Sequence, residues 1–131
     1  MSARIDAVDV AKSVLEGALD KPVSLSMADS YRRPDATVLT CGMPVPGKRY
    51  WDGSGTTSLR LTVIVKRMEE EAAISDADDA SHALNKSGAM ESRDGSYRLV
   101  SNSAETPRQL RWDEQGRWVW AFDATIEYEE R

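Results

Sequence analysis

The segment GMPVPGK, residues 42–48, has the G-x-x-x-x-G-K spacing of a phosphate-binding loop. Such a loop binds phosphate oxygens with successive backbone N–H groups, supplies a hydroxyl for Mg²⁺ and leads directly into a helix. Here Pro44 and Pro46 lack the N–H group, Arg49 occupies the hydroxyl position, and the turn-forming sequence YWDGSG follows. We therefore interpret the segment as an extended, proline-stiffened surface loop and expect no nucleotide cofactor.

The only histidine, His82, is of the residue type that most often serves as a general base. Its helical neighbours three and four positions away, Asp78, Asp79, Asn85 and Lys86, are all polar, so we expect it on a solvated helix face. No G-x-S-x-G motif accompanies it, and no cysteine can be paired with it. The sequence therefore predicts no catalytic residue.

The acidic run DADD, residues 76–79, resembles the start of a calcium-binding loop. That loop requires Gly at its sixth position and Glu at its twelfth, where this chain has Ser81 and Ser87. Cys41 is the only cysteine, so there is neither a disulfide framework nor a thiolate metal cluster. We expect no metal and no other cofactor.

The amino-acid composition limits the classes to which this protein can belong. A chain of 131 residues with 40% hydrophobic and 30% charged residues favours one soluble domain over residues 1–131. The formal net charge of −5 argues against a surface that grips duplex DNA. No run approaches the length of about 18 apolar residues typical of a membrane helix, and no signal peptide is evident, so we expect no membrane partner and synthesis in the cytoplasm.

Two segments have helical periodicity. Over residues 3–20 an apolar stripe predicts a helix whose core face contains Ile5, Val8, Ala11 or Lys12, Leu15 and Ala18. Residues 69–86 carry a narrower stripe, formed by Ala73, Ala77, Ala80 and Leu84.

Alternating or uniformly apolar runs predict six strands, at residues 22–28, 36–41, 57–67, 96–102, 107–113 and 117–128. The last is unusually long, and its even positions, including Trp118 and Trp120, are expected in the core, with Trp112 across a hairpin from them. The resulting fold class is α+β, a single mostly antiparallel sheet with two helices packed on one face.

Tyr50 and Trp51 lie in the Gly/Pro-rich loop of residues 42–56, where they cannot easily reach the core. Trp, Tyr and Arg are the residues that most often anchor protein–protein contacts. Contact with a partner, packing against the protein's own domain, and closure over a ligand all remain open for this loop.

The hairpin RWDEQGRWVW (residues 111–120) and the loop PGKRYWDG (residues 46–53), together with the order of the elements over residues 3–129, resemble the tail-terminator and minor capsid proteins of long-tailed bacteriophages. The resemblance implies a structural virion protein of the head–tail junction, with no enzymatic activity. It further implies self-association into a ring, a hexamer in that family, which caps the tail tube and meets the head-completion proteins of the neck. DNA would only pass through the ring, without sequence-specific binding.

The family offers no catalytic motif to carry over. By residue type alone, the candidate contact residues are Arg32, Arg33, Arg49, Tyr50 and Trp51. Two other classes of function remain as alternatives: a small α+β hydrolase or ligand-binding domain using His82 or a carboxylate, and a cytoplasmic adaptor module whose partner site is the 42–56 loop.

Overall fold

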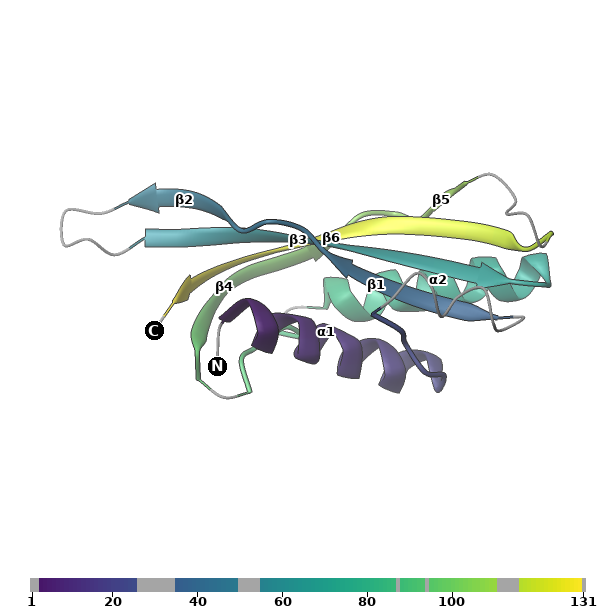
Figure 1. The fold of residues 1–131 in the computed structure, drawn as a ribbon, viewed down its shortest axis with the longest axis horizontal. Coiled ribbons are helices and arrows are strands. Elements are labelled where there is room, and N and C mark those ends of the chain that lie inside the picture. Colours follow the sequence, from purple (N-terminus) through teal and green to yellow (C-terminus); the bar gives the residue numbers. More distant parts are fainter. Residues whose placement is uncertain are drawn as a thin grey trace.

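The computed structural model describes residues 3–25, 35–49, 55–86, 88–93, 95–110 and 116–130. In chain order these residues form α1 (Ala3–Leu19), β1 (Ala36–Cys41), β2 (Val45–Arg49), β3 (Gly55–Arg67), α2 (Glu70–Asn85), β4 (Tyr97–Ala104), β5 (Arg108–Gln109) and β6 (Trp118–Glu130). The strands form one antiparallel sheet in the order β1-β3-β6-β4, in which β2 also pairs with β3 and β5 with β6. Both helices lie on the same face of this sheet (Figure 1), so the predicted α+β fold is confirmed.

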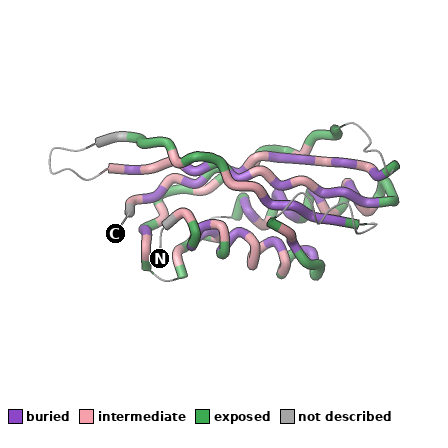
Figure 2. Tube along the Cα trace, in the orientation of Figure 1, coloured by how far each residue is buried: buried purple, intermediate pink, exposed green. Residues whose placement is uncertain are grey.

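The centre of the sheet is the pairing of β3 with β6, in register from Thr57↔Tyr128 to Arg67↔Trp118. Residues opposite each other on antiparallel strands point to the same face, and alternate residues point to opposite faces. One set of alternate residues therefore faces the helices and is buried: Leu59, Leu61, Val63 and Val65 on β3, and Phe122, Ala124, Ile126 and Tyr128 on β6. In Figure 2 the buried residues concentrate where the sheet and the helices meet.

The first helix is confirmed, but it is rotated relative to the predicted stripe. Its buried apolar residues are Ala7, Val10, Ala11, Leu15 and Leu19. Ile5 and Ala18, both predicted to lie in the core, are exposed, Ile5 by 54%. The cause is the buried carboxylate of Asp6, which accepts hydrogen bonds from the side chains of Ser92 and Ser96. Because successive helical residues point about 100° apart, drawing Asp6 inward turns Ile5 outward.

The second helix buries the predicted stripe of Ala73, Ala77, Ala80 and Leu84. Its C-terminal end is held by Asn102 of β4, whose side-chain amide donates to the carbonyl oxygens of Leu84 and Lys86, each at 2.8 Å. Gly88 follows with φ of +79°, the left-handed conformation that glycine adopts readily after a helix.

Two predictions in the N-terminal half were wrong for the residues that the structure describes. Of the strand predicted at residues 22–28, the described part contributes only an isolated parallel bridge between Ser24 and Val38, and Leu25 is 49% exposed. Conversely, the segment interpreted as a surface loop contains β2. The segment is extended as expected, but its backbone pairs with β3, and this pairing makes it a strand despite its proline.

The C-terminal strands occur where they were predicted, with different lengths. Of the strand expected at residues 107–113, the described part, residues 107–110, contains the two residues of β5, and residues 111–115, with Trp112, lie outside the described residues. The predicted long last strand is confirmed in β6, which has 13 residues. Trp118 and Trp120 are half-buried rather than fully in the core, and Trp120 packs against the edge of the core cluster.

Candidate assembly surfaces

The structure describes little of the predicted contact set. Arg32, Arg33, Tyr50 and Trp51 lie outside the described residues, so their roles stay predictions. Arg49 is the last residue of β2, and its backbone pairs with that of Gly55. Contact of these five residues with a partner therefore remains a prediction.

The most prominent surface feature is a hairpin, which we call the arm, formed by residues 42–49 and 55–60. In Figure 1 the arm extends beyond the end of both helices, and most of its β2 side is exposed in Figure 2. Val45 pairs with Ser58 and Pro46 with Thr57, and the register shifts between Pro46 and Arg49. A proline without an N–H group is tolerated here because β2 is an edge strand. Because β2 is followed by β3 rather than by a helix, this segment does not form the phosphate cradle of a P-loop.

The two strands of the arm approach closely at Gly47. A Cβ atom at this position would lie 2.5 Å from the Oγ1 atom of Thr56 and 3.2 Å from its carbonyl oxygen. Thr56 is itself only 5% exposed. The packing of the arm therefore requires a residue without a side chain at position 47.

An open hollow of about 560 Å³ lies at the base of the arm and is lined by Gly42, Met43, Val45, Ser58, Arg60 and Thr125. We call it the arm hollow. Ser58 and Arg60 alternate with the buried Leu59, so the arm hollow lies on the sheet face opposite the helices. Met43 and Val45 are 74% and 59% exposed, which makes this an apolar surface with one cation, Arg60, at its side.

A second hollow, of about 430 Å³, lies on the outer side of α1 and is lined by Arg4, Ile5, Val8, Asp9 and Leu25. We call it the helix hollow. It contains Ile5, which was expected in the core, and Leu25, from the strand predicted at residues 22–28; both are exposed. Its charged residues are Arg4, whose Nε donates to Cys41 Sγ at 3.5 Å, and the exposed Asp9.

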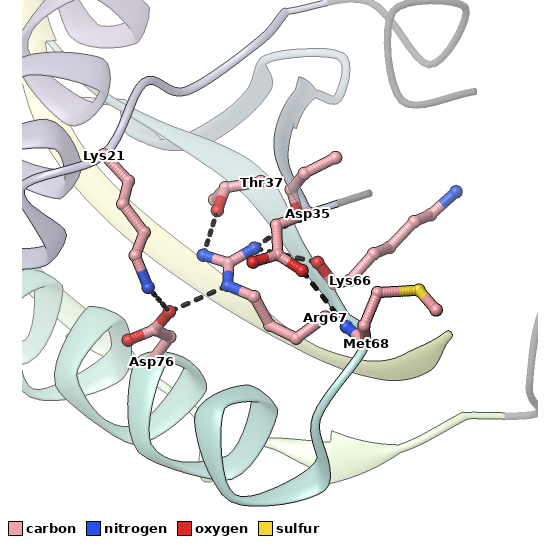
Figure 3. A network of polar contacts seen from close by, with 8 residues as sticks. Lys21, Asp35, Thr37, Lys66, Arg67, Met68 and Asp76 are labelled. Carbon is pink, nitrogen blue, oxygen red and sulfur yellow. Dashed lines mark hydrogen bonds and ion pairs between the residues drawn. The ribbon is translucent and has the colours of Figure 1, made fainter. Parts of the chain in front are cut away.

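A buried polar network fixes the body that carries these surfaces (Figure 3). The guanidinium of Arg67, whose side chain is 1% exposed, donates from Nη1 to the carbonyl oxygens of Ala36 and Lys66 and from Nη2 to Thr37 Oγ1, at 2.8–2.9 Å. Its Nε donates to Asp76 Oδ2 at 2.8 Å. One side chain thus joins the end of β3 to the start of β1 and to α2.

The carboxylate of Asp76 also accepts a hydrogen bond from Lys21 Nζ, at 2.7 Å, which ties the segment after α1 to α2. Partial burial on its own would raise the pKa of Asp76. The hydrogen bonds and positive charges of Lys21 and Arg67 outweigh that effect and hold the pKa below its ordinary value. Asp76 is therefore ionised at neutral pH, and its charge holds together the two cations that link β3 and the segment after α1 to α2.

Within the described part of the chain, the residues of the alternative functions are not gathered into a site. His82 is exposed on α2 and lines neither the arm hollow nor the helix hollow. Among the residues that the structure describes, no group of three or more His, Cys, Asp or Glu side chains is placed to bind a metal ion. The two described helices are also too short or too polar to cross a membrane.

Sequence reasoning missed the residues that line the two hollows. Ile5 fits a helical core stripe and Leu25 an alternating strand, so nothing local marks them as exposed. The signal available for Met43 and Val45 was their position between prolines and glycines, where few apolar neighbours exist to bury them. Arg60 lies between the apolar residues Leu59 and Leu61 of the same strand, a local pattern that agrees with its exposed position.

Comparison with known proteins agrees with this architecture. The sequence matches the family described as "Bacteriophage tail terminator protein" over residues 25–130. No curated protein matches it. A solved structure titled "Virion of native gene transfer agent (GTA) particle" contains a chain that superposes with a TM-score of 0.59 at 13% sequence identity, covering 98% of this chain and 95% of that one. At this identity the likeness shows a shared fold, whereas the family match covers most of the chain. The chain belongs to the bacteriophage tail terminator family, and it is a structural protein of the virion, as the sequence resemblance predicted.

Proposed function

We propose that the protein terminates the phage tail by assembling into a closed ring, a hexamer, that caps the tail tube and meets the head-completion proteins of the neck. Membership of the tail terminator family supports this function. The observation that carries it is the arm, which extends beyond the helix-covered part of the sheet (Figure 1) and on which Met43 and Val45 are 74% and 59% exposed. Exposed apolar side chains on a projecting hairpin are suited to burial against another subunit.

In this proposal the protein works by its shape, as one α+β domain over residues 1–131, and has neither a catalytic residue nor a cofactor. DNA passes through the ring without sequence-specific contacts, and the net charge of −5 favours a weak hold on its phosphates. The candidate contacts to neighbouring proteins are Arg32, Arg33, Arg49, Tyr50 and Trp51, chosen because aromatic residues and arginine dominate the binding energy of interfaces.

The test is the assembly state of the full chain, alone over a range of concentrations and mixed with tail tubes of the same phage. Analytical ultracentrifugation should detect a species at six times the 14.5 kDa mass of one chain, and negative-stain images should show rings on tube ends. A chain that stays monomeric in both conditions, while the tubes continue to lengthen in its presence, would refute the proposal.

The variant Trp51→Ala separates this function from that of an adaptor. For a tail terminator we expect weaker assembly of rings or weaker binding to tube ends, because a large aromatic contact is lost. The matched control is Trp118→Ala, which removes a half-buried tryptophan of β6 outside the 42–56 loop. Loss of one contact with an unrelated protein, with assembly intact, would favour the adaptor.

A further inference from the structure

The two hollows have the properties expected of two surfaces that pack against each other between neighbouring subunits. The arm hollow lies on the sheet face opposite the helices and the helix hollow on the outer side of α1, and they share no residue. Both are mainly apolar: Met43 and Val45 dominate the first, Ile5 and Leu25 the second. Each of these four side chains is about half exposed or more, so each gains from being covered.

A ring of more than two identical subunits requires two different surfaces on each subunit, because each copy must contact one neighbour with one surface and the other neighbour with the second. A self-complementary patch would produce only a pair of subunits. Two separate apolar hollows on one chain meet this requirement, whereas a single patch would not.

One charged side chain of the arm hollow is complementary to one of the helix hollow. Arg60 lines the arm hollow, and Asp9 lines the helix hollow. Both are exposed, and within the described part of the chain neither has an ion-pair partner. Asp123, which lies near Arg60 on β6, instead accepts a hydrogen bond from Thr62 Oγ1 at 2.7 Å. Arg4, the cation of the helix hollow, is directed to Cys41.

We infer that the arm hollow of one subunit packs against the helix hollow of the next copy of this chain, with Met43 and Val45 covering Ile5 and Leu25 and with Arg60 paired with Asp9. The inference rests on the proposed ring and identifies its subunit contact. It also explains why α1 carries an apolar residue, Ile5, that does not reach the core of its own subunit.

The experiment uses charge reversal in the full chain. Arg60→Asp and Asp9→Arg each place like charges across the contact, which disfavours association. We expect each single variant to raise the concentration of half-maximal ring assembly by about tenfold or more. Arg108→Asp, a reversal of an exposed arginine on β5 outside both hollows, is the matched control and should assemble like the unaltered chain.

Two restorations make the test specific. The double variant Arg60→Asp/Asp9→Arg recreates an opposite-charge pair at every contact. An equal mixture of the two single variants does the same when they alternate around a ring with an even number of subunits. At one contact the introduced aspartate of the first variant then meets the introduced arginine of the second, and at the next contact the retained Arg60 meets the retained Asp9. Both samples should assemble at close to the concentration needed by the unaltered chain. As a control, thermal unfolding is measured for each variant, and a cooperative transition like that of the unaltered chain verifies that the variant is folded.

Three outcomes would overturn the inference: single variants that assemble as the unaltered chain does, single variants that lose only their binding to tail tubes, or a loss that neither restoration repairs. In each of these cases the unaltered chain still forms rings, so the proposed function stands. If the unaltered chain forms no ring, the proposed function fails, and this contact fails with it.

Discussion

Replacing Asp76 with Asn tests whether the buried network of Arg67 holds α2 to the sheet. The substitution keeps the shape of the side chain and removes its negative charge, so Arg67 Nε loses the carboxylate to which it donates at 2.8 Å. Arg67 is 1% exposed and cannot turn to solvent in compensation. A buried cation would then be left without its counter-charge.

The expected loss of stability depends on how deeply the two cations that bind Asp76, Arg67 and Lys21, are buried. Breaking a buried ion pair from one side costs about 3–5 kcal/mol. Arg67 keeps its acceptors on Ala36, Lys66 and Thr37, and Asn can still accept a neutral hydrogen bond, so we expect about 2–3 kcal/mol. Lys21 is 43% exposed, and its ion pair with the same carboxylate should contribute only about 0–1 kcal/mol.

The assay is urea unfolding at pH 7 and at pH 3, with Lys21→Ala as the matched control. At pH 7, Asp76→Asn should lower the unfolding midpoint by about 1 M or more, given typical urea dependences of small domains. The pKa of Asp76 is lowered by folding, so the stability due to its charge is present above the unfolded pKa, near 3.9, and is lost as the pH falls through the folded value. The difference between the variant and the unaltered chain should therefore shrink at pH 3.

Two results would refute this reasoning. One is a loss of unfolding free energy in Lys21→Ala as large as that in Asp76→Asn. Such a result would mean that the exposed ion pair of Lys21 stabilises the fold as much as the buried pair of Arg67 does. The other is an equal difference at pH 7 and pH 3, which would mean that the charge of Asp76 does not contribute to stability.

Two further substitutions test the end of α2 and the arm. Asn102→Ala removes the amide that donates to the carbonyl oxygens of Leu84 and Lys86, and we expect a loss of about 1–3 kcal/mol, seen first as faster hydrogen exchange in the last turn of α2. Exchange that accelerates elsewhere and not in that turn would contradict the assignment. Gly47→Val places a Cβ atom 2.5 Å from Thr56 Oγ1 and should separate the strands of the arm, impairing ring assembly while the urea midpoint of the body changes little. Normal assembly by this variant would show that the close approach is dispensable.

The central strands were predictable because one physical cause dominates them. Leu59, Leu61 and Val63 alternate with polar residues since helices cover one face of the sheet and not the other, and such a pattern is local in the sequence. The same holds for the Ala73 and Ala77 stripe of α2. In these elements the burial of each side chain follows from its position within its own element.

The features that failed depend on partners far away in the sequence. The rotation of α1 is set by Asp6 and the hydroxyls of Ser92 and Ser96, which lie 86 and 90 residues further along the chain. The strand β2 forms because its backbone pairs with that of β3, although proline and glycine do not favour a strand. The exposure of Ile5 in the helix hollow follows from the first of these effects, and the position of Val45 in the arm hollow follows from the second.

The position of β6 has a consequence for how the chain folds. It is the last strand in the sequence, yet it lies between β3 and β4, and it pairs with residues of β3 about sixty positions earlier. Until β6 inserts, those two strands have unsatisfied edges, and closing so long a loop is slow. During that interval, partly folded chains at high concentration can exchange their β6 strands with one another, as in domain swapping. Refolding yield should therefore fall as chain concentration rises, and a dilute start should recover it.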